Sequence, residues 1–215
     1  AGLKADGLWD AMASTCLLCG PRTLAGALVP LRGDAPTAYA FTDGDFSRTA
    51  GLTGDAATTY LDSNRANDAD PQDDTHNAVY ATAIGSLNRT FIASGNADIL
   101  AAGTNFIGAG QISNVFTRNR SAAGTDTGAL PAIGLIAASR SESGEYVVRN
   151  AGSETAVSVN SETPTSDNVL LFRRGSDSPA YAGHSIAFYS IGTSVDLAKL
   201  DSHVSAFVTA IGAAI

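Results

Sequence analysis

An acidic stretch between two strand-like segments carries the densest set of reactive groups in the sequence. Residues 58–83 read TTYLDSNRANDADPQDDTHNAVYATA, with β-branched and aromatic residues at both ends. The carboxylates of its middle part are Asp62, Asp68, Asp70, Asp73 and Asp74. Carboxylates at this density fit three roles, namely a calcium site, one half of an acid–base pair, or a hydrated loop between strands.

The calcium interpretation fails the most demanding spacing test. An EF-hand loop places oxygen ligands at its first, third and fifth positions and glycine at its sixth. Counting from Asp62, the fifth position is Ala66 and the sixth is Asn67. A looser calcium loop in DADPQDD is the alternative to a hydrated, proline-containing loop, which we favour. We therefore predict no metal site and no cofactor.

The other carboxylates and motifs do not indicate catalysis. A glycosidase needs two carboxyls about 5 to 9 Å apart, and strand residues share a face only at even spacing. Glu142 and Glu145 are three apart around Gly144, which is typical of a hairpin turn, and Glu154 and Glu162 have no evident partner. The GxSxG, P-loop and dinucleotide-binding motifs are all absent from the sequence. We predict no catalytic residues and a protein that is not an enzyme.

The histidines and cysteines also lack partners in the sequence. His76 ends the acidic stretch, His184 begins a strand and His203 lies in the C-terminal segment, so each is predicted to be structural or solvated. Cys16 and Cys19 form a CxxC without the second pair that zinc requires. On an extended strand their side chains point to opposite faces. We expect two buried thiols and no disulfide.

Arginines and a tyrosine are the remaining candidates for ligand contacts. Arg118 and Arg120 form one cluster, and Arg173 and Arg174 form another. Such clusters could clamp an acidic sugar or the carboxylates of a partner. The interpretation that we favour is that they protect strand edges from pairing with other sheets. Tyr181, in SDSPAYAGHS, is a candidate for stacking on a sugar.

Composition limits the class of partner. The 215 residues fit one large domain, predicted to span residues 1–215. With 13 basic and 21 acidic residues the net charge is −8, which disfavours nucleic acid and anionic membranes as partners. No stretch approaches the about 18 apolar residues of a membrane span, and no signal peptide is evident.

Hydrophobicity with a period of two places most of these side chains on β-strands. Between residues 37 and 191, short runs rich in Val, Ile, Tyr, Phe and Thr are separated by Gly, Asn, Asp, Pro and Ser. A first strand is expected at Thr15–Cys19. The further strands are predicted at Tyr39–Thr42, Thr58–Leu61, Ala78–Ala83, Arg89–Ala93, Ile99–Ala101, Asn105–Gly108, Asn114–Arg118, Ala132–Ser139, Tyr146–Arg149, Thr155–Val159, Asn168–Arg173 and Ser185–Ser190. Because no long amphipathic helix separates them, we expect two stacked antiparallel sheets.

Helices are expected mainly at the two ends of this β-rich region. Asp6–Ala13 is predicted to be a short helix that buries Leu8, Trp9 and Met12. In the C-terminal segment, Ser194 is the expected N-cap and Asp196 lies in the first turn. An apolar stripe follows at helical spacing: Leu197, Leu200, Val204, Phe207, Val208, Ile211 and Ile215. We expect this stripe to pack on the sandwich, with a homotrimer seam as the alternative.

Three segments resemble a domain of bacteriophage structural proteins. They are GLKADGLWDAM (residues 2–12), TGDAATTYLDSNRANDADPQDDTHNAVYATA (residues 53–83) and SIAFYSIGTSVDLAKLDSHVSAFVTAIGAAI (residues 185–215). The resemblance covers nearly the whole chain, and its motifs are architectural rather than catalytic. It implies an all-β, antiparallel jelly-roll sandwich of the concanavalin A-like or laminin-G-like type. The acidic stretch is then a loop that joins two core strands.

The same resemblance implies a place on the surface of a virion, such as a tail fibre. We expect a non-enzymatic module that contacts a host-surface glycan or receptor, with other virion proteins as partners. The alternatives are a capsid-decoration or fibre-assembly protein and, third, a polysaccharide depolymerase. No ligand-binding residue transfers from the family, so the resemblance assigns none.

Overall fold

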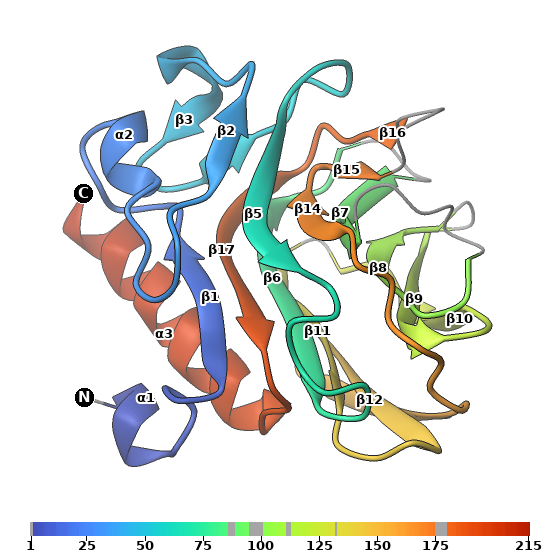
Figure 1. Cartoon of the computed structure of the whole chain (residues 1–215). Helices are drawn as coiled ribbons and strands as arrows, with labels where there is room; N and C mark the ends of the chain where they lie inside the picture. Colours follow the sequence, from blue (N-terminus) through green and yellow to red (C-terminus); the bar gives the residue numbers. More distant parts are fainter. Residues whose placement is uncertain (1, 86–88, 95–100, 111–112, 132, 175–179) are drawn as a thin grey trace.

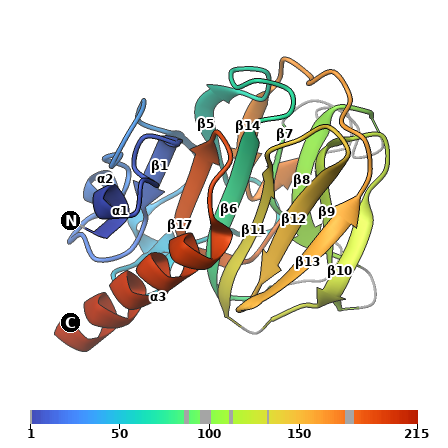
Figure 2. The same cartoon turned by 90° about the horizontal axis from the view of Figure 1, so that it is seen from below.

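Two antiparallel β-sheets stacked face to face form the body of the chain (Figures 1 and 2). The computed structural model describes residues 2–85, 89–94, 101–110, 113–131, 133–174 and 180–215. Within these ranges every strand pair is antiparallel. The structure confirms the predicted all-β sandwich with a short N-terminal helix and a C-terminal helix.

The strand order defines the two layers. Sheet A runs in the order β13 (Ser153–Ser158), β12 (Glu145–Asn150), β11 (Gly134–Arg140), β6 (Thr75–Ala83), β17 (Ser185–Gly192), β4 (Gly51–Thr53) and β3 (Phe46–Ser47), with β1 (Met12–Leu17) also paired to β17. Sheet B runs in the order β10 (Thr125–Ala129), β9 (Asn114–Ser121), β8 (Thr104–Ala109), β7 (Arg89–Ser94), β14 (Asn168–Leu171), β5 (Tyr60–Ala66) and β2 (Thr37–Tyr39). A separate pair joins β15 (Arg173–Arg174) and β16 (Ala180–Tyr181).

Sheet A is covered on both faces, which explains why its central strands are buried throughout. In β6, Val79 and Ala81 join the core between the sheets, whereas Ala78 and Tyr80 face a second apolar layer. This alternation is the period of two that the sequence displays. Helix α3 (Leu197–Ala214) belongs to the second layer, through buried residues such as Leu200. The outer face of sheet A is therefore closed by α3 (Figure 2).

The C-terminal helix begins two residues later than the expected N-cap implies. The N-cap is Asp196, whose carboxylate accepts the backbone N–H of Lys199 at 3.0 Å. Ser194 instead donates its own N–H to the Asp74 carboxylate at 2.7 Å, which holds the preceding segment against the acidic stretch. Ile211 packs against the second apolar layer with most of the predicted stripe, whereas Phe207 stays 54% exposed.

The predicted N-terminal helix at Asp6–Ala13 is wrong in position. Helix α1 is Gly2–Ala5, and Met12 already begins β1. Gly7 has a φ of 73°, and the N–H of Leu8 donates to the Leu3 carbonyl at 2.9 Å. This geometry ends a helix at a left-handed glycine. Leu8 and Met12 are buried as predicted, while Trp9 is half-buried.

The other sequence-based boundaries are correct to different degrees. Cys16 packs in the core between the sheets and Cys19 in the second layer, so the two free thiols point to opposite sides as predicted. The expected strand at Tyr39–Thr42 lies earlier, at β2, because Ala40 adopts a φ of 59°. Short segments that the pattern missed include β3, β4, β10, β16, the turn of helix α2 (Leu24–Ala27) and the 3₁₀ helix η1 (Asp43–Asp45). Residues 99, 100 and 132 of the expected strands lie outside the described residues.

A buried arginine holds the acidic stretch in place. Arg120, in β9, is 1% exposed, and its guanidinium donates to the backbone carbonyls of residues 67, 70, 71 and 72. The carboxylate of Asp70 accepts a hydrogen bond from a second arginine, Arg65, whose Nε lies 3.2 Å away. Ser161 binds Asp73 and also accepts from Gln72 at 2.9 Å. The stretch is therefore a fixed connection between β5 and β6, as the loop interpretation predicts, but its Asn67 and Asp70 are buried rather than hydrated.

Two histidines are buried without a charge partner in direct contact. The Nδ1 atom of His76 faces the Thr193 carbonyl at 2.5 Å, so it carries the proton, and Nε2 accepts from Ser190 at 2.8 Å. His184 stacks on Phe91 with 4.0 Å between ring centroids. Burial lowers the pKa of His76 and that of His184 to about 4 in each case. Both rings therefore stay neutral well below their ordinary range.

Replacing Arg120 with methionine should destabilise the fold by on the order of 3 to 5 kcal/mol, because several buried carbonyls lose their donor. Urea unfolding measures the loss. Arg22→Met is the matched control, since Arg22 is exposed and its loss should change the stability by less than about 0.5 kcal/mol. Equal stability of the two variants would show that Arg120 does not hold the loop.

The free energy of unfolding should fall as the pH is lowered from about 6.5 to about 4. In this window the unfolded chain binds protons at His76 and His184 that the folded chain does not, so acid favours unfolding. Each histidine accounts for on the order of 3 kcal/mol at the acidic end. His184→Phe keeps the stacking with Phe91 and should reduce this pH dependence by about half. Unchanged pH dependence in urea unfolding of this variant would contradict the assignment.

Candidate functional site

The arginine cluster of Arg118 and Arg120 is buried and does not form a binding surface. Arg118 is 2% exposed and Arg120 is 1% exposed. Arg118 donates to the Ala101 carbonyl, and Arg120 donates to the acidic stretch. Both interpretations of this cluster, the clamp for an acidic ligand and the guard of a strand edge, are therefore wrong. The reason is that β9 is enclosed along most of its length, a property that its alternation does not reveal.

The histidines do not form a catalytic site. His76 and Ser190 do lie 2.8 Å apart, as the base and nucleophile of a hydrolase would, but both are 0% exposed. The second ring nitrogen faces a backbone carbonyl rather than a carboxylate. His203 binds Asp6 at 2.6 Å and thereby ties α3 to the segment after α1. These contacts stabilise the fold.

The glutamates and aspartates are dispersed. Glu142 lies in the turn after β11 and Glu145 begins β12, so the predicted hairpin is confirmed. Glu154 pairs with Arg149 at 3.2 Å. Among the described residues, no group of three or more His, Cys, Asp and Glu side chains could hold a metal ion. No described helix is long and apolar enough to cross a membrane.

A tyrosine pair on the outer face of sheet B is the first part of the candidate site. Tyr39 of β2 and Tyr60 of β5 are directly opposite in the antiparallel register. Leu61, the next residue, points into the core and is buried, so Tyr60 points outward. The two rings stack in parallel, with centroids 4.2 Å apart and 2° between their planes. Tyr39 is 41% exposed, which leaves ring surface for a ligand.

The pair β15–β16 adds a cation and a third ring. Phe172, between β14 and β15, is buried with a φ of 66°, and this left-handed residue turns the chain out of sheet B. Beyond the turn, the Arg173 guanidinium lies 4.7 Å from the Tyr60 centroid and 5.5 Å from that of Tyr181. The Tyr60 and Tyr181 centroids are 6.3 Å apart. We call Tyr39, Tyr60, Arg173 and Tyr181 the tyrosine–arginine cluster.

Polar side chains flank this cluster on the same face. Two residue pairs along from Tyr39 and Tyr60, and therefore on the same face, Thr37 is opposite Asp62. The Asp62 carboxylate accepts from Asn168 of β14 at 3.1 Å, and Asn64 donates to the Thr37 hydroxyl at 2.9 Å. Burial raises the pKa of Tyr60, while the positive charge of Arg173 acts in the opposite direction. The phenol therefore stays neutral, with its hydroxyl able to donate and to accept hydrogen bonds.

The chemistry that this arrangement supports is stacking combined with polar recognition. Flat rings on a rigid sheet contact the apolar face of a sugar, and nearby hydroxyl, amide and carboxylate groups bind its hydroxyls. Arg173 and Tyr181 are residues that the sequence analysis singled out. Tyr39 and Tyr60 have no signal in the sequence as candidates, because only the register of β2 on β5 brings them together. Alternation in TTYLDSN did place Tyr60 and Asp62 on one face.

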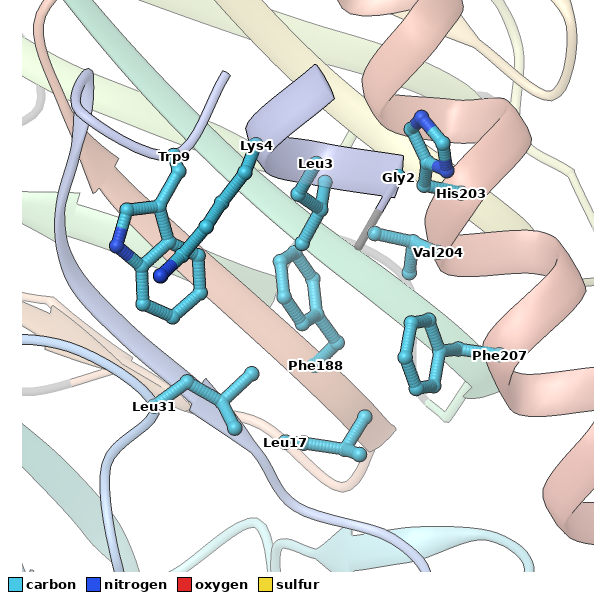
Figure 3. Close-up of a pocket in the computed structure, with 10 residues that line it drawn as sticks. All are labelled: Gly2, Leu3, Lys4, Trp9, Leu17, Leu31, Phe188, His203, Val204 and Phe207. Carbon is cyan, nitrogen blue, oxygen red and sulfur yellow. The ribbon is translucent and has the colours of Figure 1, made fainter. Parts of the chain in front are cut away.

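A second feature is an apolar groove on the opposite side of the molecule. It has a volume of about 290 Å³ and lies between α1, β1 and α3 (Figure 3). Its walls are mainly Leu3, Trp9, Leu17, Leu31, Phe188, Val204 and Phe207. Lys4 lies over the Trp9 ring at 5.1 Å and His203 lies at the rim. With only these two titratable side chains in its lining, the groove suits an apolar group rather than a sugar.

Comparison with known proteins places the chain by fold. No protein-family model matches it, and no curated protein matches it in sequence. Among solved structures it is similar to the binding domain of botulinum neurotoxin serotype D, with a TM-score of 0.57 and 12% identity over 91% of this chain and 51% of that chain. The chain thus spans about half of that structure.

Two further similarities have TM-scores below 0.5. The enzymatically active domain of tailspike protein 2 from bacteriophage CBA120 gives 0.48 at 11% identity, over 76% of this chain and 28% of that chain. Domain 4 of AbnA, a GH43 extracellular arabinanase from Geobacillus stearothermophilus solved with arabinotriose, gives 0.48 at 15% identity, over 80% and 82%. These two similarities carry no argument about activity. The similarity to the toxin domain supports the β-sandwich fold alone.

Proposed function

We propose that this chain is a non-enzymatic adhesion module on the surface of a bacteriophage or phage-like particle, where it binds a host-surface glycan. The tyrosine–arginine cluster is the observation that carries the proposal. The particle context rests on the resemblance of residues 2–12, 53–83 and 185–215 to phage structural proteins. Other virion proteins are the partners that this context implies.

The position of the cluster suits adhesion. It lies on the outer face of sheet B, whereas α3 packs on the outer face of sheet A (Figure 2). The rings are fixed by stacking on one another and by a strand pair, so little side-chain entropy is lost when a ligand binds. A surface of this kind contacts one face of a sugar and leaves the opposite face of that sugar uncovered.

Tyr39→Ala should weaken binding of a soluble host-surface oligosaccharide by about tenfold, a loss of about 1.4 kcal/mol. A glycan array first identifies the ligand, and calorimetric titration then compares the variants. Phe207→Ala is the matched control, because Phe207 is also an exposed aromatic residue but lines the opposite groove. Its affinity should equal that of the unaltered chain.

Two outcomes would overturn this proposal. The first is a folded chain that binds no glycan on the array, and the second is full affinity in Tyr39→Ala. Release of reducing ends from a bound polysaccharide would replace adhesion by a depolymerase activity.

A structural role in particle assembly is the second candidate, and the apolar groove favours it. Phe207 is 54% exposed and Leu31 is 45% exposed beside it. The occupant that this candidate requires is a second copy of this chain, whose exposed Phe207 and Leu31 would pack into the groove. Sedimentation should then show concentration-dependent self-association that Phe207→Ser abolishes. A monomer at all concentrations would exclude this candidate.

A further inference from the structure

The arginine of the tyrosine–arginine cluster contacts aromatic rings rather than a described carboxylate. Acidic residues outnumber basic ones by 21 to 13, and other arginines, such as Arg65 and Arg149, form ion pairs. Arg173 forms no ion pair with any described residue. Its Nε atom is buried without a hydrogen-bond partner in the described part of the chain. Because this Nε atom is closed to a ligand, the terminal nitrogens of the guanidinium are the donors left for a carboxylate.

The stacking of Arg173 presets its orientation. Tyr39 covers one face of the Tyr60 ring at 4.2 Å, so the guanidinium, 4.7 Å from the same centroid, lies on the other face. Tyr181 adds a second ring contact at 5.5 Å. Contact with two aromatic rings leaves the edge of the planar guanidinium to form hydrogen bonds. Because a guanidinium binds a carboxylate through two parallel N–H···O bonds along that edge, the geometry fits this anion better than a hydroxyl.

We infer that the glycan bound by the tyrosine–arginine cluster contains an acidic sugar, a hexuronic acid or a sialic acid-type residue, whose carboxylate pairs with Arg173. This inference rests on the proposed function and names the ligand class of the same site. The chain's net charge of −8 repels anions in general. Preference for an acidic sugar therefore depends on this local contact rather than on the field of the whole protein.

The flanking residues define which way the sugar lies. Asp62 is two residue pairs along the sheet from Tyr39 and Tyr60, on the same outer face. Its carboxylate repels the acid of the ligand and accepts hydrogen bonds from sugar hydroxyls. Because Tyr39 and Arg173 lie on opposite faces of Tyr60, the acidic residue of the glycan lies on the Arg173 side and a neighbouring sugar stacks on Tyr39.

Matched pairs of oligosaccharides test this ligand class. One pair is sialyllactose and lactose, and the other is an oligogalacturonate and its methyl ester. The unaltered chain should bind the acidic member of at least one pair about tenfold more tightly than the neutral member. This preference should decrease as salt is added, because the ion pair is partly exposed to solvent.

Arg173→Gln should abolish the acidic preference while binding of the neutral member persists. Arg173→Lys should keep part of the preference, since it retains the charge but loses the two-bond geometry. Arg174→Gln is the matched control: the adjacent strand residue points to the opposite side of β15, so the preference should remain. Thermal unfolding of each variant establishes that it is folded.

The outcomes separate this inference from the proposed function. Equal affinity of the unaltered chain for acidic and neutral members would overturn the acidic ligand and leave glycan adhesion intact. An equal loss of preference in Arg174→Gln and Arg173→Gln would show a general charge effect and would also overturn it. The absence of binding to every glycan tested would remove both proposals.

Discussion

The guanidinium of Arg120 is the interaction on which the arrangement of the two sheets depends. It lies in β9 of sheet B, yet its hydrogen bonds end on carbonyls of the segment that leaves β5 and enters β6 of sheet A. One side chain thus satisfies backbone acceptors that a buried, irregular segment cannot satisfy by itself. Asn67 extends the network by donating to the Gly103 carbonyl at 2.9 Å. Without these donors, the buried carbonyls of this connection would lack hydrogen-bond partners.

This constraint also positions the candidate site. Once the path from β5 to β6 is fixed, β5 lies beside β14, and its alternation turns Tyr60 outward. Asp55, in the segment before β5, accepts the backbone N–H groups of Ala57, Thr58 and Thr59 and so fixes the entry to the strand. The motif of residues 53–83 is therefore architectural in both of its halves. It also contributes Tyr60 and Asp62 to the candidate site.

The sequence predicts the fold better than the site, for a physical reason. The residue pattern identifies β6, β11 and β17 because each of these strands buries its apolar side chains. The apolar stripe of α3 follows from helical spacing. Strand register is set by contacts between distant segments, so the stacking of Tyr39 on Tyr60 has no local signal. The burial of Arg118 and Arg120 likewise depends on contacts between distant segments. It was not predicted because arginine is exposed in most proteins. The N-terminal helix was misplaced because the left-handed Gly7 outweighs the helical spacing after it.

The central strand of sheet A has a consequence for how the chain acquires its structure. Strand β17 pairs with both β1 and β6, and the hydroxyls of Thr15 and Ser190 meet at 3.0 Å across 175 positions. During synthesis, β1 and β6 therefore wait with open edges until the final strand emerges. Pairings between such remote segments form slowly because closing a long loop costs entropy before any contact compensates for it. The nascent polypeptide is thus exposed to aggregation until the residues of β17 have left the ribosome.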